Sequence, residues 1–308
     1  MTAKVSLQTA TGEHLAQLTT ERQNTASSDL DTKSALEIAQ IMNAEDRKVP
    51  EAVGQALGKI AAAIDAITDA LGRGGRLIYV GAGTSGRIAA LDASECPPTF
   101  GISPERVQYV MAGGEKALGR AAEYNEDSRA AGAADMAKRK PGKRDVVVGI
   151  AASGRTPYTI AAVEYARKRG AKTVAVTCNA NSELGRAAEI EIVAEVGPEI
   201  VSGSTRLKAG TAQKLILNML TTGAMTRLGY VYGNLMINVG MKNEKLNARA
   251  ANVLERAASV DLATAGAALE KAGRNVPVAL VMIKCNVGKV EAMRRLKRAQ
   301  GNVRKAIG

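Results

Sequence analysis

The stretch LIYVGAGTSGR at residues 77–87 predicts a short buried strand that runs into a glycine loop and then into a helix. A second stretch, VVVGIAASGRTPY at 146–158, repeats this pattern, and its Ser-Gly-Arg lies 68 residues after the first one. In open parallel sheets, the loops at the carboxyl ends of the strands face a common crevice in which ligands bind. The two stretches therefore predict a parallel sheet and a ligand site that both loops line.

Short apolar segments alternate with longer segments of helical periodicity on both sides of these loops. We expect further strands at 107–111, 145–150, 172–177 and 190–193, and helices at 31–43, 50–71, 116–139, 158–169 and 211–228. This alternation is typical of an α/β fold in which helices cover both faces of a parallel sheet, in three layers. Beyond residue 246 only helical periodicity remains. The predicted domains are therefore a polar arm at 1–23, an α/β domain at 24–246 and a small all-helical domain of about four helices at 247–308.

Composition and charge exclude several classes of protein. The chain has 308 residues, of which 46% are apolar, so it can bury a large core and is not a disordered chain. Its formal charge is +12, but residues 245–308 contribute +9 of this. The basic stretch at 291–305 has no interleaved aromatic residue, which favours a solvated helix face over a nucleic-acid site. No apolar run could span a membrane and no signal-peptide core is present, so we expect a cytoplasmic protein without a membrane partner.

The scarcity of histidine restricts the possible chemistry. His14 is the single histidine and lies in a polar segment, so we expect neither a metal site nor a Ser-His-Asp triad. The cysteines Cys96, Cys178 and Cys285 are far apart and lack metal-ligand spacing, which favours free intracellular thiols. Any general acid–base catalysis must therefore use carboxylate, lysine, tyrosine or cysteine side chains.

The two glycine loops are the strongest candidates for a binding site. Residues 81–86 match the dinucleotide pattern G-x-G-x-x-G, but the next predicted strand lacks the acidic residue that would bind a ribose. Hydroxyl groups beside the N–H groups of a helix N-terminus suit a phosphomonoester better. We therefore expect a sugar phosphate, with a dinucleotide and plain structural turns as alternatives. The candidate residues are Gly83, Thr84, Ser85 and Gly86 in the first loop and Ser153, Gly154 and Thr156 in the second, where the glycines would permit close approach of a ligand.

Three basic residues and one serine near these loops have two interpretations each. Arg87 and Arg155 follow the loops, and each could reach the phosphate or begin the next helix and pair with a carboxylate. Ser204 and Lys208 precede the long helix expected from residue 211. They could line the same crevice or form an ordinary helix N-terminus.

Several longer motifs carry a family resemblance. They are EDRKVPEAV (45–53), GAGTSGR (81–87), DASECPPT (92–99), EDSR (126–129), GIAASGRTPY (149–158), GSTRLKAGTAQKLILNM (203–219) and NEKLNARAANV (243–253). Together they resemble the N-acetylmuramic acid 6-phosphate etherases, which are sugar-isomerase-domain (SIS) proteins of bacterial cell-wall recycling. The resemblance runs from about residue 20 to the end, and DASECPPT combined with EDSR is its most specific part. It implies an SIS-type sheet with a helical appendage, a sugar-phosphate substrate, a homodimer and no cofactor.

The resemblance also implies which side chains react. A family member removes D-lactate from the C3 ether of N-acetylmuramic acid 6-phosphate by elimination and then adds water. By resemblance Glu95 is the acid that protonates the ether oxygen and Glu126 is the base that removes the C2 proton, with Ser94 counted among the binding residues. Lys208 would neutralise the lactyl carboxylate or the phosphate.

From the residues alone, both glutamates have ordinary alternatives. Pro97 and Pro98 predict an extended segment that holds Glu95 beside the first loop, but a solvated or capping glutamate would have the same pattern. The alternatives to Glu126 as the base are Glu115, Glu123 and Asp127. Cys96 adjoins Glu95, and without a histidine to activate it we expect it to pack rather than react.

Two other functions would use the same loops. The first is an aldose–ketose isomerase of hexose 6-phosphates, which would release no lactate. The second is a sugar-phosphate-sensing regulator, because a eukaryotic glucokinase regulator is similar in its SIS domains. That regulator carries two SIS units, whereas 308 residues hold only one.

Overall fold

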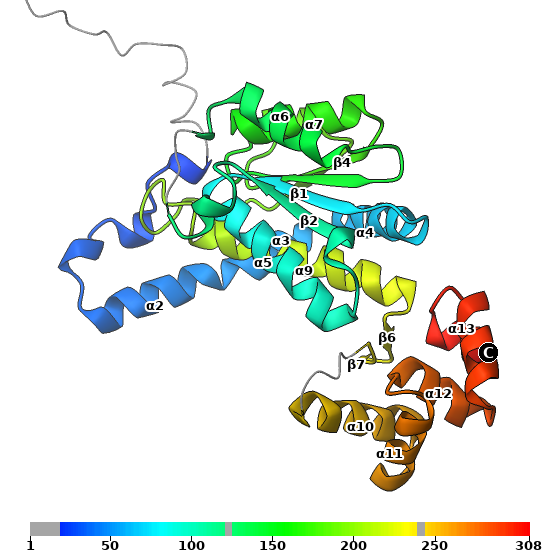
Figure 1. Cartoon of the computed structure of the whole chain (residues 1–308). Coiled ribbons are helices and arrows are strands. Elements are labelled where there is room, and N and C mark those ends of the chain that lie inside the picture. Colours follow the sequence, from blue (N-terminus) through cyan, green and yellow to red (C-terminus); the bar gives the residue numbers. More distant parts are fainter. Residues whose placement is uncertain (1–18, 121–124, 239–243) are drawn as a thin grey trace, which may run out of the picture.

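The central feature of the computed structural model is a five-stranded parallel sheet (Figure 1). The model describes residues 19–120, 125–238 and 244–308. The strands are β1 Leu77–Gly81, β2 Val107–Met111, β3 Val146–Ile150, β4 Lys172–Thr177 and β5 Ile190–Val193. Their order in the sheet is β2-β1-β3-β4-β5. The connection from β1 to β2 therefore runs toward one edge of the sheet, and the connections from β3 to β4 and β5 run toward the other edge. This reversal is the topological switch point at which open α/β sheets form their ligand crevice.

Helices cover both faces of the sheet, so the predicted three-layer α/β fold is confirmed. One layer holds α3 Lys48–Gln55, α4 Leu57–Gly72, α5 Gly83–Phe100 and α9 Lys208–Leu228. The opposite layer, at the top of Figure 1, holds α6 Arg129–Arg139, α7 Pro157–Lys168 and α8 Glu183–Ala187. Alternate residues of β1 enter the two cores: Leu77 and Tyr79 face the α9 side, and Ile78 and Val80 face the α7 side. Every residue of β1 and β3 is buried, which explains their uninterrupted apolar sequences.

The helix bounds differ from the sequence predictions at several points. The first predicted helix starts at Ala35 rather than at residue 31, because Ser34 and Glu37 form a capping box. The helix predicted at 50–71 is two helices, since the chain breaks at Ala56 between α3 and α4. The predicted helix at 116–139 reduces to η5 Glu115–Leu118 and α6, and residues 121–124 of that range lie outside the described part.

The helix α2 Ala35–Asp46 extends away from the body of the molecule (Figure 1). Its side chains are mostly exposed, including Leu36 at 68%. Only its last turn is anchored, through the buried side chain of Glu45. Three single-turn 3-10 helices precede it: η1 Thr19–Glu21, η2 Thr25–Ser27 and η3 Leu30–Thr32. A fourth, η4 Pro104–Arg106, leads into β2.

The chain beyond α9 builds a separate hydrophobic core. A hairpin of β6 Val231–Tyr232 and β7 Leu235–Met236, which the sequence did not predict, leads to the helices α10 Glu244–Ala258, α11 Leu262–Lys271, α12 Val276–Cys285, α13 Lys289–Arg298 and α14 Val303–Ile307. Ile237, Leu254, Leu280 and Val303 are fully buried in this core. We call residues 231–308 the C-terminal module. It adjoins the carboxyl end of α9 (Figure 1), and none of the described helices could cross a membrane.

Candidate active site

A polar pocket of about 460 Å³ lies at the carboxyl ends of β1 and β3. The two strands are neighbours, and Gly81 at the end of β1 pairs in register with Ile150 at the end of β3. This pairing brings the two glycine loops side by side, as the sequence predicted. The pocket is lined by Glu21, Ala82, Gly83, Thr84, Ser85, Arg87, Met111, Ala112, Ala117, Glu126, Ala151, Ala152, Ser153, Thr156, Gly203 and Thr205.

Two long helices begin at this pocket. The helix α5 starts at Gly83, whose φ of +52° lies in the left-handed region that favours glycine. The helix α7 starts at Pro157, directly after the lining residue Thr156. The N-terminal N–H groups of a helix attract anions, and the hydroxyl groups of Thr84, Ser85 and Ser153 stand beside them. The pocket can therefore bind a phosphate through local dipoles and hydroxyl groups.

The carboxylate of Glu126 lies against the first glycine loop. A Cβ atom placed on Gly83 would lie 3.1 Å from Oε1 of Glu126, so the carboxylate lies close to the backbone of this loop. The backbone carbonyl of Glu126 accepts a hydrogen bond of 3.0 Å from the N–H of Tyr158, which fixes it to the start of α7. Ser128 then caps α6 by accepting from Ala131 N at 3.1 Å. The glutamate is thus held between two helix N-termini.

The alternatives to Glu126 lie elsewhere. Asp127 is exposed and does not line the pocket. Glu115 lines a different groove, beside the edge strand β2. Glu123 lies outside the described residues. The geometry therefore supports Glu126 as the base among the described candidates.

Glu21 and Thr205 line the pocket although neither was among the predicted site residues. Glu21 belongs to η1, within the predicted polar arm, and a Cβ atom on Gly203 would lie 3.3 Å from its Oε2. No local pattern marks Glu21, whereas Thr205 lies in the motif at 203–219, next to the predicted Ser204. Only the folded arrangement brings them to the loops.

Glu95 does not line this pocket, and the expectation of an extended segment around it is wrong. Residues 92–99 belong to α5, which continues through Pro97 and Pro98 to Phe100. The prolines lie in the last turn, where Gly101 (φ +66°) ends the helix and donates to Pro97 O at 2.9 Å. Glu95 is exposed and lies 12 residues beyond Gly83, about 18 Å along the helix axis. Ser94 also lies away from the pocket, where its hydroxyl donates to Leu91 O at 2.9 Å.

Asp92, in the same motif, is the buried centre of a hydrogen-bond network. Its carboxylate accepts from Tyr79 Oη at 2.9 Å, Asn218 Nδ2 at 2.7 Å and Thr221 Oγ1 at 3.2 Å. Burial raises the pKa of Asp92 above its usual range despite these hydrogen bonds. Cys96 is buried beside it, and burial raises the pKa of that thiol to about 12. These contacts join β1, α5 and α9, and a thiol that stays protonated supports packing as the role of Cys96.

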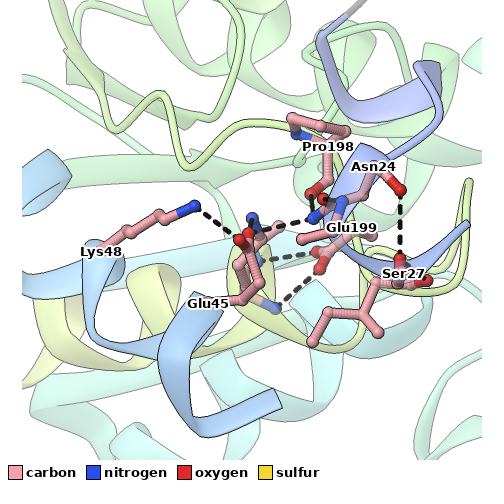
Figure 2. Close-up of polar contacts among 10 residues, drawn as sticks. Asn24, Ser27, Glu45, Lys48, Pro198 and Glu199 are labelled. Atoms are coloured by element: carbon pink, nitrogen blue, oxygen red, sulfur yellow. Dashed lines mark hydrogen bonds and ion pairs between the residues drawn. The ribbon is translucent and has the colours of Figure 1, made fainter. Parts of the chain in front are cut away.

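Lys208 is also absent from the pocket lining. The side chain of Lys208 is 1% exposed, and its ammonium group forms an ion pair with Glu45 at 2.7 Å. Figure 2 shows the carboxylate of Glu45 and the polar groups that bind it. Burial alone would raise the pKa of Glu45, but hydrogen bonds from Lys208, Lys48 and Asn24 lower it to about 2. Glu199 accepts from the N–H groups of Lys208 and Ala209, each at 2.9 Å, and so caps α9. Ser204 lies between two lining residues but does not itself line the pocket.

The two arginines of the Ser-Gly-Arg tripeptides differ in their contacts. Arg87 lines the pocket and donates hydrogen bonds to three backbone carbonyls, those of Ala117, Leu118 and Arg120. Arg155 is half-buried and does not line the pocket. The repeated sequence therefore has two different local environments.

Gly86 and Gly154 pack closely against neighbouring segments of the protein. A Cβ atom on Gly86 would lie 2.7 Å from Met111 Cγ, and one on Gly154 would lie 2.3 Å from Ser182 Cβ. Neither glycine lines the pocket, so the close approach that the sequence suggested is to neighbouring protein segments. Among residues 19–120, 125–238 and 244–308, no group of three or more His, Cys, Asp or Glu side chains is placed to hold a metal ion.

Two family models match the chain. A model described as the glucokinase regulatory protein N-terminal SIS domain matches residues 59–167, and a model described as the SIS domain matches residues 119–223. The matched ranges include both glycine loops and the strands β1–β5.

Similar curated proteins cover nearly the whole chain. The N-acetylmuramic acid 6-phosphate etherase of Clostridium beijerinckii is 49% identical over 294 residues, which are 96% of this chain and 97% of that protein. The protein of the same name from Oenococcus oeni is 51% identical over 293 residues, 95% of this chain and 99% of its own. A phosphoheptose isomerase structure from Francisella tularensis aligns with 63% of this chain and all of its own at 20% identity, with a TM-score of 0.48.

Proposed function

The chain belongs to the N-acetylmuramic acid 6-phosphate etherase family, and from this premise we propose how its pocket performs the ether cleavage that gives the family its name. The observation that carries the proposal is the approach of the Glu126 carboxylate to the glycine loop at Gly83. A phosphate bound by that loop places the sugar beside a base. The products are N-acetylglucosamine 6-phosphate and D-lactate.

The 6-phosphate binds at the N-termini of α5 and α7. Thr84, Ser85, Ser153 and Thr156 supply hydroxyl groups, and the backbone N–H groups of the two helix N-termini supply dipoles and donors. Arg87 is the single arginine or lysine in the described lining, alongside two glutamates. Recognition of the phosphate therefore depends on these local groups rather than on bulk positive charge.

Glu126 acts as the base in the first step. In the open-chain sugar the C1 aldehyde acidifies the C2 proton, and the carboxylate removes that proton. The electron pair left at C2 forms the C2–C3 double bond as the C3–O bond breaks, and a general acid protonates the lactyl oxygen that leaves. Water then adds its oxygen to C3, while a proton returns to C2. No electrons are gained or lost overall, so the reaction needs no redox partner.

Glu95 is the proposed general acid, but the same chain cannot bring it to its own pocket. The exposed position of Glu95 on α5, about 18 Å beyond the glycine loop, fits a homodimer in which it faces the pocket of the second copy. Leu91, one turn earlier on α5, is 53% exposed and marks an uncovered apolar surface beside it. We place the reaction in the cytoplasm, which the free cysteines Cys96, Cys178 and Cys285 support.

Release of D-lactate tests the proposed function directly. The purified protein is incubated with N-acetylmuramic acid 6-phosphate, and lactate is measured with a coupled dehydrogenase. In ¹⁸O-labelled water the product should carry the label at C3. Interconversion of hexose 6-phosphates without lactate would instead support an isomerase. A folded protein that releases no lactate contradicts the proposal.

Substitution of the two glutamates separates the two steps. Glu126→Gln should slow exchange of the C2 proton with deuterated solvent by at least about 100-fold, because a base is lost. Glu95→Gln should slow lactate release by a similar factor but leave exchange at C2 measurable. Asp127→Asn, on the exposed neighbour of Glu126, is the matched control and should change neither rate. Normal exchange in Glu126→Gln would show that another group is the base.

A further inference from the structure

The side chain of Arg87 joins two segments that are far apart in the sequence. Arg87 lies in the second turn of α5, directly after Thr84, Ser85 and Gly86. Its Nε donates to Leu118 O at 3.1 Å, and its Nη2 donates to Ala117 O at 3.0 Å and to Arg120 O at 3.1 Å. One guanidinium group thus binds three carbonyls of the segment 117–120.

The segment 117–120 contributes Ala117 to the pocket lining and precedes Glu126 in the chain. Ala117 is 2% exposed and lines the pocket with Glu126. Arg87 anchors the segment 117–120, and the hydrogen bond from Tyr158 N anchors the backbone of Glu126. The start of α5 therefore carries the phosphate-binding hydroxyl groups and also holds a segment that lines the same pocket as the base.

We propose that Arg87 is a positioning residue, which holds the segment 117–120 and thereby sets the place of Glu126 relative to the bound phosphate. This inference rests on the proposed function of Glu126. Two of the three guanidinium nitrogens, Nε and Nη2, donate to backbone carbonyls of the segment 117–120. These nitrogens are therefore occupied by protein contacts and are not free to bind a phosphate in a bidentate manner. Arg155, in the equivalent place after the second loop, does not line the pocket.

A lysine cannot replace this arrangement. The planar guanidinium fork offers donors in fixed, divergent directions, whereas an ammonium group is a single point of donation. Arg87→Lys therefore keeps the positive charge but loses the simultaneous contacts to residues 117, 118 and 120. A phosphate ligand would tolerate this change much better than a positioning residue would.

The experiment compares Arg87→Lys and Arg87→Ala with the wild type. For each protein we would measure kcat and KM for lactate release, the rate of C2 proton exchange, and inhibition by inorganic phosphate. Misplacement of a reacting group by about 1 Å lowers turnover by about 100-fold. We expect both variants to lose about that factor in kcat and in exchange, with phosphate inhibition changed less than about threefold. Guanidinium chloride at millimolar concentration should restore part of the activity of Arg87→Ala but none of that of Arg87→Lys.

Arg76→Lys is the matched control for a purely structural loss. Arg76 also donates to two backbone carbonyls, those of Arg139 and Lys140, and pairs with Asp145 at the opposite end of the sheet. Arg76→Lys should lower the melting temperature without changing kcat or KM. Circular dichroism establishes that each Arg87 variant is folded before it is assayed.

The results distinguish failure of the inference from failure of the proposed function. If Arg87→Lys keeps near-wild-type kcat while Arg87→Ala raises KM and abolishes phosphate inhibition, Arg87 is a phosphate ligand and the inference is wrong. If both folded variants keep wild-type kinetics, the segment needs no such anchor and the inference is also wrong. If the wild type itself releases no lactate, the function assigned to the pocket fails.

Discussion

Lys208 and Glu45 form an ion pair that is almost completely enclosed, with the two side chains 1% and 6% exposed. Asn24 adds a hydrogen bond of 3.0 Å to the same carboxylate, and Lys48 binds its other oxygen. Glu45 lies in the last turn of α2, Lys208 begins α9, and Asn24 lies in the segment that follows Glu21. The pair therefore fixes the base of α2 and the start of α9 behind the pocket.

Glu45→Gln should destabilise the fold and remove part of its acid sensitivity. At pH 7 the variant leaves the Lys208 ammonium buried without its carboxylate, so we expect a loss of about 3 kcal/mol in the free energy of unfolding. In the wild type the folded pKa of Glu45 is about 2, below its ordinary value of 4.5. The stabilisation is therefore complete above about pH 4.5 and disappears as the pH falls toward 2.

Urea unfolding at pH 7 and at steps between pH 5 and 2.5 measures both effects. Over this range the wild type should lose more stability than Glu45→Gln. Asp69→Asn removes an exposed carboxylate that pairs with Arg73 and should cost less than about 1 kcal/mol. Equal acid sensitivity of wild type and Glu45→Gln would contradict the assignment.

Helix packing against the pocket depends on one glycine of α6. A Cβ atom on Gly132 would lie 2.0 Å from the carbonyl oxygen of Tyr158, so α6 and α7 approach each other too closely for any side chain there. Tyr158 is also the residue whose N–H holds the carbonyl of Glu126. The contact between these two helices therefore contributes to the position of the base.

Gly132→Ala should cost about 3 kcal/mol in the free energy of unfolding, because backbone must move to admit the methyl group. It should also lower kcat, since a shift of α7 against α6 displaces Glu126. Gly54→Ala in α3 is the control: a Cβ atom there has no neighbour within 4 Å, and alanine should stabilise that helix by about 0.5 kcal/mol. Urea unfolding and the lactate assay test both variants, and unchanged stability in Gly132→Ala would contradict the packing argument.

The strands were predictable from the sequence, but parts of the helices were not. Three strands have the predicted bounds, 107–111, 172–177 and 190–193, because each is a short run rich in apolar and β-branched residues. The continuation of α5 through Pro97 and Pro98 was not predictable, since it depends on tertiary packing. Cys96 and Phe100 are buried in the core shared with α9, and Asp92 is bonded across to Asn218.

The candidate site, too, was predictable from the sequence only in part. Gly83, Thr84, Ser85, Ser153 and Thr156 follow the ends of strands, and the sheet brings them to one pocket because parallel strands end at the same edge. The sequence predicted Glu95 beside the first loop and allowed Lys208 in the crevice, but the fold puts both outside the pocket of their own chain. Glu21 reaches the pocket through long-range packing that no local pattern encodes.

Over the whole molecule, exposed apolar surface is present on the helices that flank α9. Leu57 on α4 and Leu91 on α5 are each 53% exposed. A groove of about 680 Å³ between α4 and α9 is lined by Ile60, Ile64, Leu215 and Met219 among other residues. The projecting helix α2 adds the exposed Leu36. Surface of this kind fits the proposed homodimer.

The double variant Leu57→Glu/Leu91→Glu should be a monomer and should lose lactate release, because charged side chains oppose burial at an interface. Sedimentation equilibrium should give twice the 32.1 kDa chain mass for the wild type and the single mass for the variant. Val290→Glu, at an 83% exposed position of the C-terminal module, should leave both mass and activity unchanged. A wild-type monomer with full activity would rule out the dimer.

Mixing two inactive variants tests whether Glu95 acts on the second copy. After exchange of subunits, half of the Glu95→Gln and Glu126→Gln chains form hybrid dimers, and each hybrid has one pocket with both glutamates. Lactate release should then recover to about a quarter of the wild-type rate. If both glutamates act within one chain, the mixture stays inactive.

The separate core of the C-terminal module has a consequence for thermodynamic measurement. Cooperativity in unfolding arises from shared burial, and the residues buried in this module form a cluster distinct from those that pack on the sheet. Heating should therefore produce two calorimetric transitions rather than one. The chain has no tryptophan, and none of its seven tyrosines lies beyond residue 232. Six of these tyrosines precede the module, and only Tyr232 lies within it, where it packs against its core. Tyrosine signals consequently follow mainly the sheet-bearing part, whereas far-ultraviolet circular dichroism averages over both.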